Sequence, residues 1–341
     1  MSKKIIYRLC GLFCFVLIIS VAVVYFTFDI RALNYLSMFN HTCILLALGS
    51  LAVGLIFDGM RLVTLANVAD SRLSYKNVVN VVLSNYFLAL VTPGASGGAI
   101  AQVMFMRKAG VPVAKATAVV LVRTVMSICF LILLVPVVLY TDPYIANWMH
   151  PGVLATVSIV FVSLPVLAGY LMHTDYPERL IYNLTARCEH RTRRHAFKWY
   201  AEFKTASMLM GRHPVMMMRA FLESGLSLLF IYGTVPAFFT GLNFDFDLRT
   251  VMGRMVLLNL VLYFSPTPGG SGIAEAGFVV LFKNICPIGV EGIMAVLWRF
   301  AAEYLPFMLG AVVTIKAFGS GVLQLASLGS KEKKHEIYRK E

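Results

Sequence analysis

Two short stretches, TPGASGG at residues 92–98 and SPTPGGSG at residues 265–272, decide the fold because each interrupts a long apolar segment. The first lies within 77–106 and the second within 250–284. Proline and glycine clusters break helices, and broken backbone in hydrocarbon is tolerated only where protein buries it or a wet cavity faces it. We therefore expect two re-entrant hairpins, each made of two half-helices. The alternative is that both stretches merely link short ordinary helices.

The composition places both stretches in a membrane. Of the 341 residues, 59% are hydrophobic and 14% charged, with a mean hydropathy of +0.76. Average globular chains are about half apolar and a quarter charged, so a soluble enzyme, a disordered chain and a disulfide scaffold are excluded. A membrane helix needs about 20 apolar residues. The segments of about that length predict an all-α polytopic protein: 9–28, 42–58, 77–106, 115–140, 151–173, 215–241, 250–284 and 289–318.

The two halves of the chain resemble each other. The pattern Thr-Pro-Gly-small-Ser-Gly occurs at 92–97 and at 267–272, and each copy is followed by Val-Leu-x-Arg, ending at Arg123 and at Arg299. A matched motif with a matched downstream arginine indicates an internal duplication with a period of about 175 residues. The repeats would cover about 9–140 and 151–318 of a single membrane domain, 1–318.

Basic residues predict the topology of these repeats. The net charge is +13, and the basic residues gather in the N-terminal tail, in three loops and in the C-terminal tail (loops 59–76, 107–115 and 174–214; tail 319–341). Cytoplasmic loops carry an excess of Lys and Arg. All five stretches become cytoplasmic if both hairpins are re-entrant and both termini lie inside. This predicts six transmembrane helices plus two hairpins in an inverted-topology repeat, an arrangement typical of secondary transporters.

The first apolar run, 9–28, is interpreted as a retained helix because it lacks a clear small-x-small cleavage site. The basic loop 174–214 is expected to meet anionic lipid head groups at the cytoplasmic face. The six cysteines form no CxxC pair and are interpreted as small hydrophobes. No catalytic residue, metal site, cofactor or nucleic-acid partner is expected.

Charged residues inside the apolar segments are expected to pair or to face water, because each costs about 2.5–3.5 kcal/mol in the bilayer centre. They are Arg123, Arg219, Glu223, Glu275, Arg299, Glu303 and Lys316. Arg219–Glu223 and Arg299–Glu303 have i,i+4 spacing, so each pair shares a helix face. The first pair is expected to be structural. Arg123 and Arg299 either hold an anionic head group or brace the hairpins by hydrogen bonds.

The hairpin tips supply a second device for binding anions. A half-helix that starts after such a turn presents free N–H groups and the positive end of its dipole. Glu275 either caps such a half-helix or binds a proton or an amine. The substrate site is therefore expected where the tips meet, near the bilayer midplane. Its candidate residues are Pro93, Gly94, Ser96, Gly97, Arg123, Pro268, Gly269, Gly270, Ser271, Gly272, Glu275, Arg299 and Glu303.

The stretch PGGSGIAE at 268–275, followed by Arg299, resembles the membrane domain of the lysylphosphatidylglycerol synthase family. So does the looser PGASGG at 93–98, followed by Arg123. The resemblance covers about 5–318. It implies the flippase half of the family's two-domain members, since the cytosolic domain that transfers lysine from lysyl-tRNA has no counterpart here: 174–214 and 319–341 are too short to fold as one.

The resemblance therefore implies a flippase of the bacterial inner membrane that moves an anionic or aminoacylated phospholipid by alternating access. Glu275 and Glu303 would balance a cationic head group or couple protons. On this hypothesis Arg299→Ala abolishes transport while the protein still folds. Two alternatives stay open: a phosphatidylglycerol lysyltransferase-type enzyme, as the family name implies, and a non-transporting partner of a lipid or glycan synthase. A homodimer is also compatible with the sequence.

Overall fold

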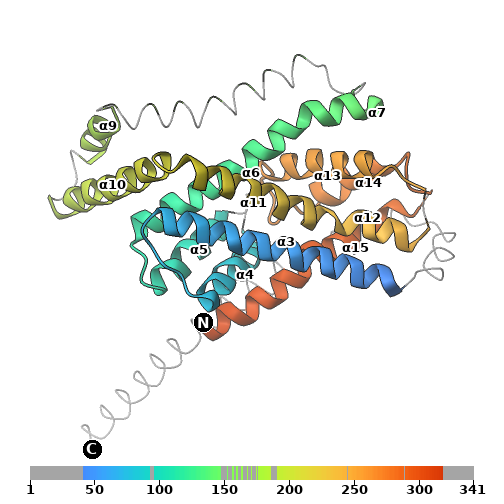
Figure 1. Ribbon diagram of the computed structural model, residues 1–341, viewed down its shortest axis with the longest axis horizontal. Helices are drawn as coiled ribbons and strands as arrows, with labels where there is room; N and C mark the ends of the chain where they lie inside the picture. Colours follow the sequence, from blue (N-terminus) through green and yellow to red (C-terminus); the bar gives the residue numbers. More distant parts are fainter. Residues whose placement is uncertain are drawn as a thin grey trace, which may run out of the picture.

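The computed structural model is a bundle of helices (Figure 1). It describes residues 41–92, 96–146, 176–185, 190–243, 245–287 and 289–317, with isolated positions at 152, 156, 159, 163, 167, 170 and 174. The predicted first span, 9–28, and the tail 319–341 lie outside the described residues, and the predicted span 151–173 is described only at isolated positions. In the described part there is no β-strand, and the chain is an all-α polytopic membrane protein.

Within the described ranges, four helical stretches are long and apolar enough to cross a membrane, and they match four predicted spans. They are Thr42–Val68, Val113–Thr141, Pro214–Gly241 and Glu291–Ala317. The first lies in α3 (His41–Val68) and the second is α6 (Val113–Thr141). The third joins α11 (Pro214–Tyr232) to α12 (Thr234–Gly241). The fourth joins α15 (Glu291–Arg299), the π-helical turn η1 (Phe300–Tyr304) and helical residues 305–317.

The interrupted segments form shorter helices on either side of each break. In the first half these are α4 (Tyr75–Val91) and α5 (Ser96–Lys108), which pack against each other. In the second half they are α13 (Leu248–Leu262) and α14 (Ile273–Phe282). At 1.5 Å per residue, α5 and α14 reach only roughly 20 and 15 Å, short of the roughly 30 Å hydrocarbon core. Their lengths agree with helices that do not cross a membrane.

The paired short helices lie at different places along the bundle. Figure 1 places α4 and α5 toward one end of the long axis, and α13 and α14 toward the other. The order of long helix, short pair and long helix occurs twice along the chain. Both observations agree with two repeats, and the inverted relation between them remains a prediction.

The core is divided in two, with one part around each short pair. One cluster packs α3, α4, α5 and the first half of α6 around residues such as Leu65, Val81 and Met106. The other packs α12 to α15 and the second half of α6, with Phe239, Phe278 and Trp298 fully buried. A small third cluster joins α4 to η1 and the helix that follows. This division leaves space between the two short pairs.

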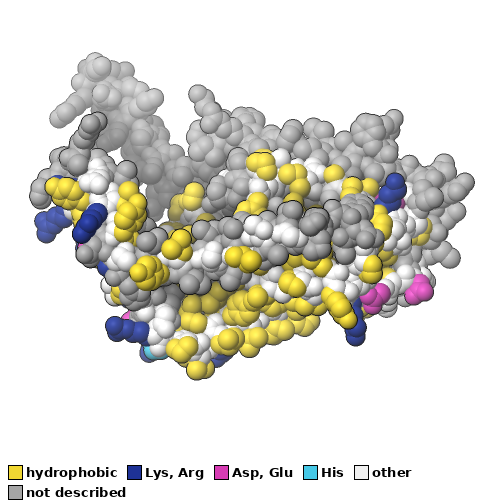
Figure 2. All heavy atoms as spheres, turned by 90° about the horizontal axis from the view of Figure 1, so that it is seen from above, with side chains coloured by type: hydrophobic (Ala, Val, Ile, Leu, Met, Phe, Trp, Pro, Cys, Tyr) yellow, Lys and Arg dark blue, Asp and Glu magenta, His cyan; other side chains and the backbone are white. Residues whose placement is uncertain are grey.

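Exposed apolar side chains cover much of the outer surface. Figure 2 shows hydrophobic side chains across the middle of one face, with charged side chains toward its two ends. Examples on the long helices are Leu45 at 71% exposed and Leu133 at 57%. An exposed apolar surface of this extent marks contact with a membrane or a partner, in agreement with the apolar spans.

Two further helices lie in the stretch predicted to be a basic loop. They are α9 (Tyr176–Thr185) and α10 (His190–Gly211), and α10 packs against α6. A four-residue helix, α7 (Pro143–Ala146), follows α6 directly.

Candidate functional site: a polar cavity between the two broken segments

A cavity of about 410 Å³ lies between the two halves of the chain. Typical ligand pockets hold about 300–1,000 Å³. The first half contributes Asp58, Arg61, Tyr86, Gln102 and Arg123. The second half contributes lining residues from α11, α13, the second tip and the last long helix, namely Ser227, Tyr232, Asn259, Tyr263, Ser265, Gly269, Gly270, Trp298 and Glu303. Both predicted hairpin segments therefore take part in one site.

The second tip is a tight turn that only glycine allows. Gly269, Gly270 and Gly272 have φ values of 56°, 69° and 82°, a region that L side chains rarely adopt. A Cβ on Gly269 would lie 2.4 Å from Cδ1 of Leu90. Because Leu90 lies in the last turn of α4, the second tip lies directly against the C-terminal end of that helix. The Ser271 hydroxyl donates to the Pro268 carbonyl oxygen at 2.8 Å, so it closes the turn.

Arg299 fastens this tip to the last long helix. Its Nη1 donates to the Gly269 carbonyl oxygen at 2.9 Å and also to the Glu303 carboxylate. Its Nε donates to the Glu275 carboxylate at 3.2 Å. Glu275 in turn accepts the Gly272 N–H at 2.8 Å, at the start of α14. The structure contains both i,i+4 ion pairs that the sequence predicts, Arg299–Glu303 and Arg219–Glu223.

This geometry assigns different positions to the predicted residues of the second half. Arg299 and Glu275 are 0% exposed and are absent from the cavity lining, whereas Glu303 does line the cavity. Glu275 takes the capping role that the sequence offered as one of its alternatives. Arg299 takes the bracing role, with its side chain buried behind the residues that line the cavity.

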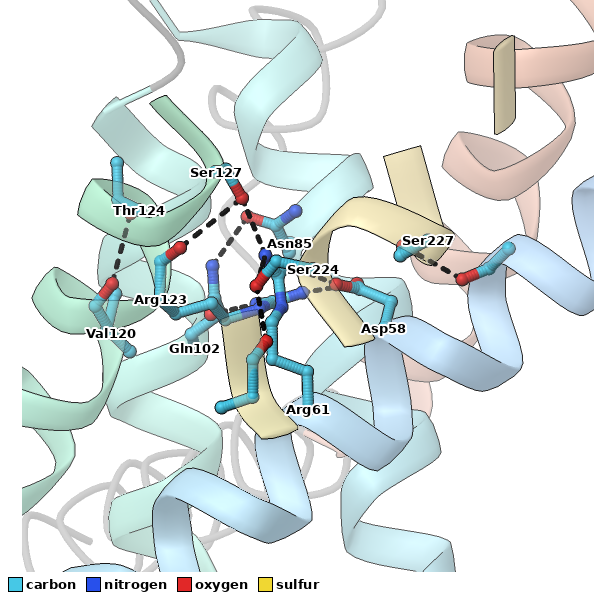
Figure 3. Close-up of polar contacts among 12 residues, drawn as sticks. Asp58, Arg61, Asn85, Gln102, Val120, Arg123, Thr124, Ser127, Ser224 and Ser227 are labelled. Carbon is cyan, nitrogen blue, oxygen red and sulfur yellow. Dashed lines mark hydrogen bonds and ion pairs between the residues drawn. The ribbon is translucent and has the colours of Figure 1, made fainter. Parts of the chain in front are cut away.

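Arg123 occupies a different setting in the first half. It lines the cavity, donates to Gln102 and pairs with the carboxylate of Asp58. Gln102 donates to Asn85 at 2.7 Å, which ties α5 to α4 (Figure 3). Arg123 is therefore held by a carboxylate from α3 and by an amide from the predicted hairpin segment.

Asp58 also pairs with Arg61, which the sequence analysis placed in a cytoplasmic loop. That placement is wrong, because α3 continues to Val68 and Arg61 is only 5% exposed inside it. Arg61 donates to the hydroxyls of Ser127, on α6, and of Ser224, on α11. The helix continues past residue 58 because an i,i+3 ion pair removes the need for the charges to leave the bundle. That Asp-x-x-Arg spacing was the available signal.

The first tip is described only in part. Pro93 and Gly94 lie outside the described residues, and nothing is described of the Ser96 side chain. Gly97 is buried, and its N–H donates to the Thr92 hydroxyl at 2.8 Å. Of the candidate residues after this tip, the structure brings only Arg123 to the cavity.

The two ion clusters carry opposite charge. In the first, two guanidinium groups (Arg61 and Arg123) share one carboxylate, so one positive charge is in excess. In the second, one guanidinium (Arg299) serves two carboxylates, so one negative charge is in excess. The cavity therefore has a positive wall in the first half and, at Glu303, a negative wall in the second.

A third buried pair was missed by the sequence analysis although Arg254 lies inside a predicted apolar segment. Its Nε donates to Asp142 at 2.6 Å, and its Nη1 donates to the Leu281 carbonyl and to Asn284. Neither Arg254 nor Asp142 lines the cavity. This pair ties the C-terminal end of α6 to α13 and α14, a structural role.

Comparison with known proteins identifies the family of the chain. Residues 13–310 match the family model described as the lysylphosphatidylglycerol synthase TM region. A UPF0104 membrane protein from Archaeoglobus fulgidus is 21% identical over 270 residues, which cover 74% of this chain and 80% of that protein. The family match spans both broken segments and every described residue of the cavity. The chain is therefore a multi-pass membrane protein that belongs to the family of the lysylphosphatidylglycerol synthase transmembrane region.

Proposed function

We propose that this protein is a lipid transporter, a flippase of the bacterial cytoplasmic membrane that moves an anionic or aminoacylated phospholipid between leaflets. The observation that carries the proposal is the polar cavity between two broken helical segments, inside a bundle with an apolar outer surface. A phospholipid needs such a path for its head group, while its acyl chains stay in lipid. Broken helices that meet near the bilayer midplane are the usual setting of transporter sites.

The charges of the cavity support a head group rather than an apolar ligand. Asp58, Arg61, Arg123 and Glu303 all line it. Charged residues at membrane depth are costly and commonly mark substrate or ion pathways. The basic residues of α10, at the predicted cytoplasmic face, would attract anionic lipids toward the protein. The proposed movement is alternating access, in which the two halves close the cavity on one side at a time.

A leaflet assay tests the proposal. The purified protein is reconstituted in liposomes with fluorescently labelled phosphatidylglycerol or its lysyl derivative, and a membrane-impermeant quencher reports the accessible fraction. We expect translocation well above protein-free liposomes. Arg123→Gln should slow it about tenfold or more, because hydrogen bonds to a charged group contribute about 1.5–3 kcal/mol each.

Arg219→Gln is the matched control. Its side chain is 59% exposed and lies outside the cavity, so removing this charge should leave the rate within about twofold. Translocation that equals the protein-free rate for both lipids, with folded protein, would contradict the transport proposal and favour the non-transporting partner. Equal loss in both variants would contradict the role of the cavity.

A further inference from the structure

The positive wall of the cavity has more donors than acceptors. Arg61 and Arg123 are 5% and 4% exposed, and each gives one Nη2 to a different oxygen of Asp58 (Figure 3). A guanidinium carries five N–H donors. The Nε atoms of both arginines are buried and have no hydrogen-bond acceptor. Two guanidiniums next to each other share one carboxylate and have two donors without an acceptor, so they can accommodate a further acceptor that carries negative charge.

No such acceptor is supplied by the lining nearby. The other groups in contact with these two arginines are neutral: the amide of Gln102 and the hydroxyls of Ser127 and Ser224. Among the described lining residues the remaining carboxylate is Glu303, which is already paired with Arg299. The excess positive charge at this wall is therefore local and faces the cavity.

We infer that Arg61 and Arg123 form a subsite for a phosphate group, with Asp58 as the counter-ion that the phosphate displaces. Guanidinium groups match phosphate oxygens in a bidentate fork. Asp58 holds the two arginines at the same wall, and a phosphate with several acceptor oxygens can take over both. Arg299, the repeat-related arginine, also has one buried donor without an acceptor, Nη2. It does not share this role, because two carboxylates already outnumber its charge and it does not line the cavity.

The inference deepens the proposed function and rests on it for the identity of the ligand. A phosphate can come from a phospholipid head group or from free phosphate, and both present the same oxygens. The head group is favoured, because the site lies between helices whose outer surfaces are apolar.

A charge series at the subsite tests the inference. Gln102→Glu adds a second carboxylate beside Arg123 with almost no change of shape, so it should neutralise the excess charge and weaken phosphate binding about tenfold or more. Asp58→Asn removes the counter-ion and keeps an acceptor oxygen, so it should tighten phosphate binding. A purely structural cluster would not respond in opposite directions. Arg219→Gln removes an exposed arginine outside the cavity and is the matched control, for which the affinity should not change.

The affinity is obtained from the thermal unfolding midpoint of the full chain in neutral detergent, measured against ligand concentration. The ligands are dihexanoylphosphatidylglycerol, dihexanoylglycerol as the same lipid without phosphate, and inorganic phosphate. We expect the midpoint to rise with the phospholipid and not with dihexanoylglycerol. A rise with inorganic phosphate as well supports a subsite open to free phosphate, whereas a rise with the phospholipid alone supports the lipid as the source.

Equal responses to dihexanoylphosphatidylglycerol and dihexanoylglycerol would overturn the inference, as would affinities that stay unchanged across the charge series. Asp58→Asn leaves two arginines without a carboxylate, and that variant is set aside where it does not fold. Gln102→Glu then decides the test by itself, because a second carboxylate beside the two arginines should keep the protein folded. Binding in this assay without translocation in the leaflet assay leaves the subsite standing and removes the transport proposal. Translocation at the same rate in all variants of the charge series would contradict the phosphate subsite and leave the transport proposal standing.

Discussion

At the scale of single residues, the two repeat-related arginines have taken different roles. Arg123 lines the cavity beside a carboxylate that it shares with a second arginine. Arg299 is fully buried between two carboxylates and the turn that carries Gly269. The difference comes from the number of carboxylates near each arginine. A guanidinium between two carboxylates is neutralised and holds the structure together, whereas two guanidiniums that share one carboxylate keep a net positive charge for a ligand.

Loss of Arg299 is therefore expected to destabilise the fold, in contrast to the expectation from sequence that Arg299→Ala folds normally. Removal of one partner from a buried ion pair costs about 3–5 kcal/mol, because the remaining charge is left unpaired. We expect Arg299→Gln to lower the thermal midpoint strongly. The double variant Arg299→Gln, Glu303→Gln should recover part of this loss, since one unpaired carboxylate is removed.

Unfolding of the single and double variants in detergent checks this expectation. The control is Glu303→Gln alone, which leaves Arg299 with Glu275 and should be milder than Arg299→Gln. Additive losses in the double variant would show that the two residues do not interact, contrary to their contact in the structure.

At the scale of elements, the second broken segment depends on a turn that side chains cannot enter. The turn between α13 and α14 has positive φ at three glycines and touches the end of α4. The proline and glycine content of this stretch predicted the break correctly, because these residues remove helix hydrogen bonds and permit positive φ. What the turn touches was not visible in the sequence pattern.

Gly269→Ala is expected to destabilise the protein by about 1–3 kcal/mol. Alanine at φ 56° is strained, and its Cβ would overlap Leu90, whose side chain can move only against the packed third cluster. The thermal midpoint measures the effect. Gly49→Ala is the control, because a Cβ at that helical position meets nothing within 4 Å. Gly49→Ala should be neutral or slightly stabilising, and equal losses at both glycines would contradict the assigned contact.

At the scale of the whole molecule, the protein is two cores with a polar cavity between them and an apolar outer surface. The short helix pairs lie toward opposite ends of the bundle (Figure 1). The long helices α3 and α6 contribute residues to both cores, and a smaller cluster around Phe87 and Phe307 joins α4 to the last long helix beside the cavity.

The predicted orientation gives a test at this scale. Arg72, between α3 and α4, and Arg249, at the start of α13, are both exposed. The predicted topology puts Arg72 on the cytoplasmic face and Arg249 on the opposite face. In a variant without its native cysteines, Arg249→Cys should react with an impermeant maleimide in intact cells. Arg72→Cys should react only after the membrane is permeabilised. Reaction of both positions in intact cells, or the reverse order, would contradict the predicted topology.

The sequence by itself determined the class of the protein and the position of its breaks. Long apolar segments, interrupted by TPGASGG and SPTPGGSG, predict helices and turns because backbone hydrogen bonding in lipid leaves few choices. It also identified Arg123, Arg299, Glu275 and Glu303 as charges that need partners, because an unpaired charge in a membrane is too costly to keep.

Only the tertiary structure decided which partners these charges have. Asp58 comes from α3, and its contacts with Arg123 join residues 65 positions apart. Arg61 was assigned to a loop because local charge pattern does not reveal a helix that buries its own ion pair. Which arginine faces the cavity follows from packing between elements, and no local spacing in the sequence encodes it. The physical reason is that burial and charge balance are properties of the assembled bundle, whereas helix breaks are properties of a few adjacent residues.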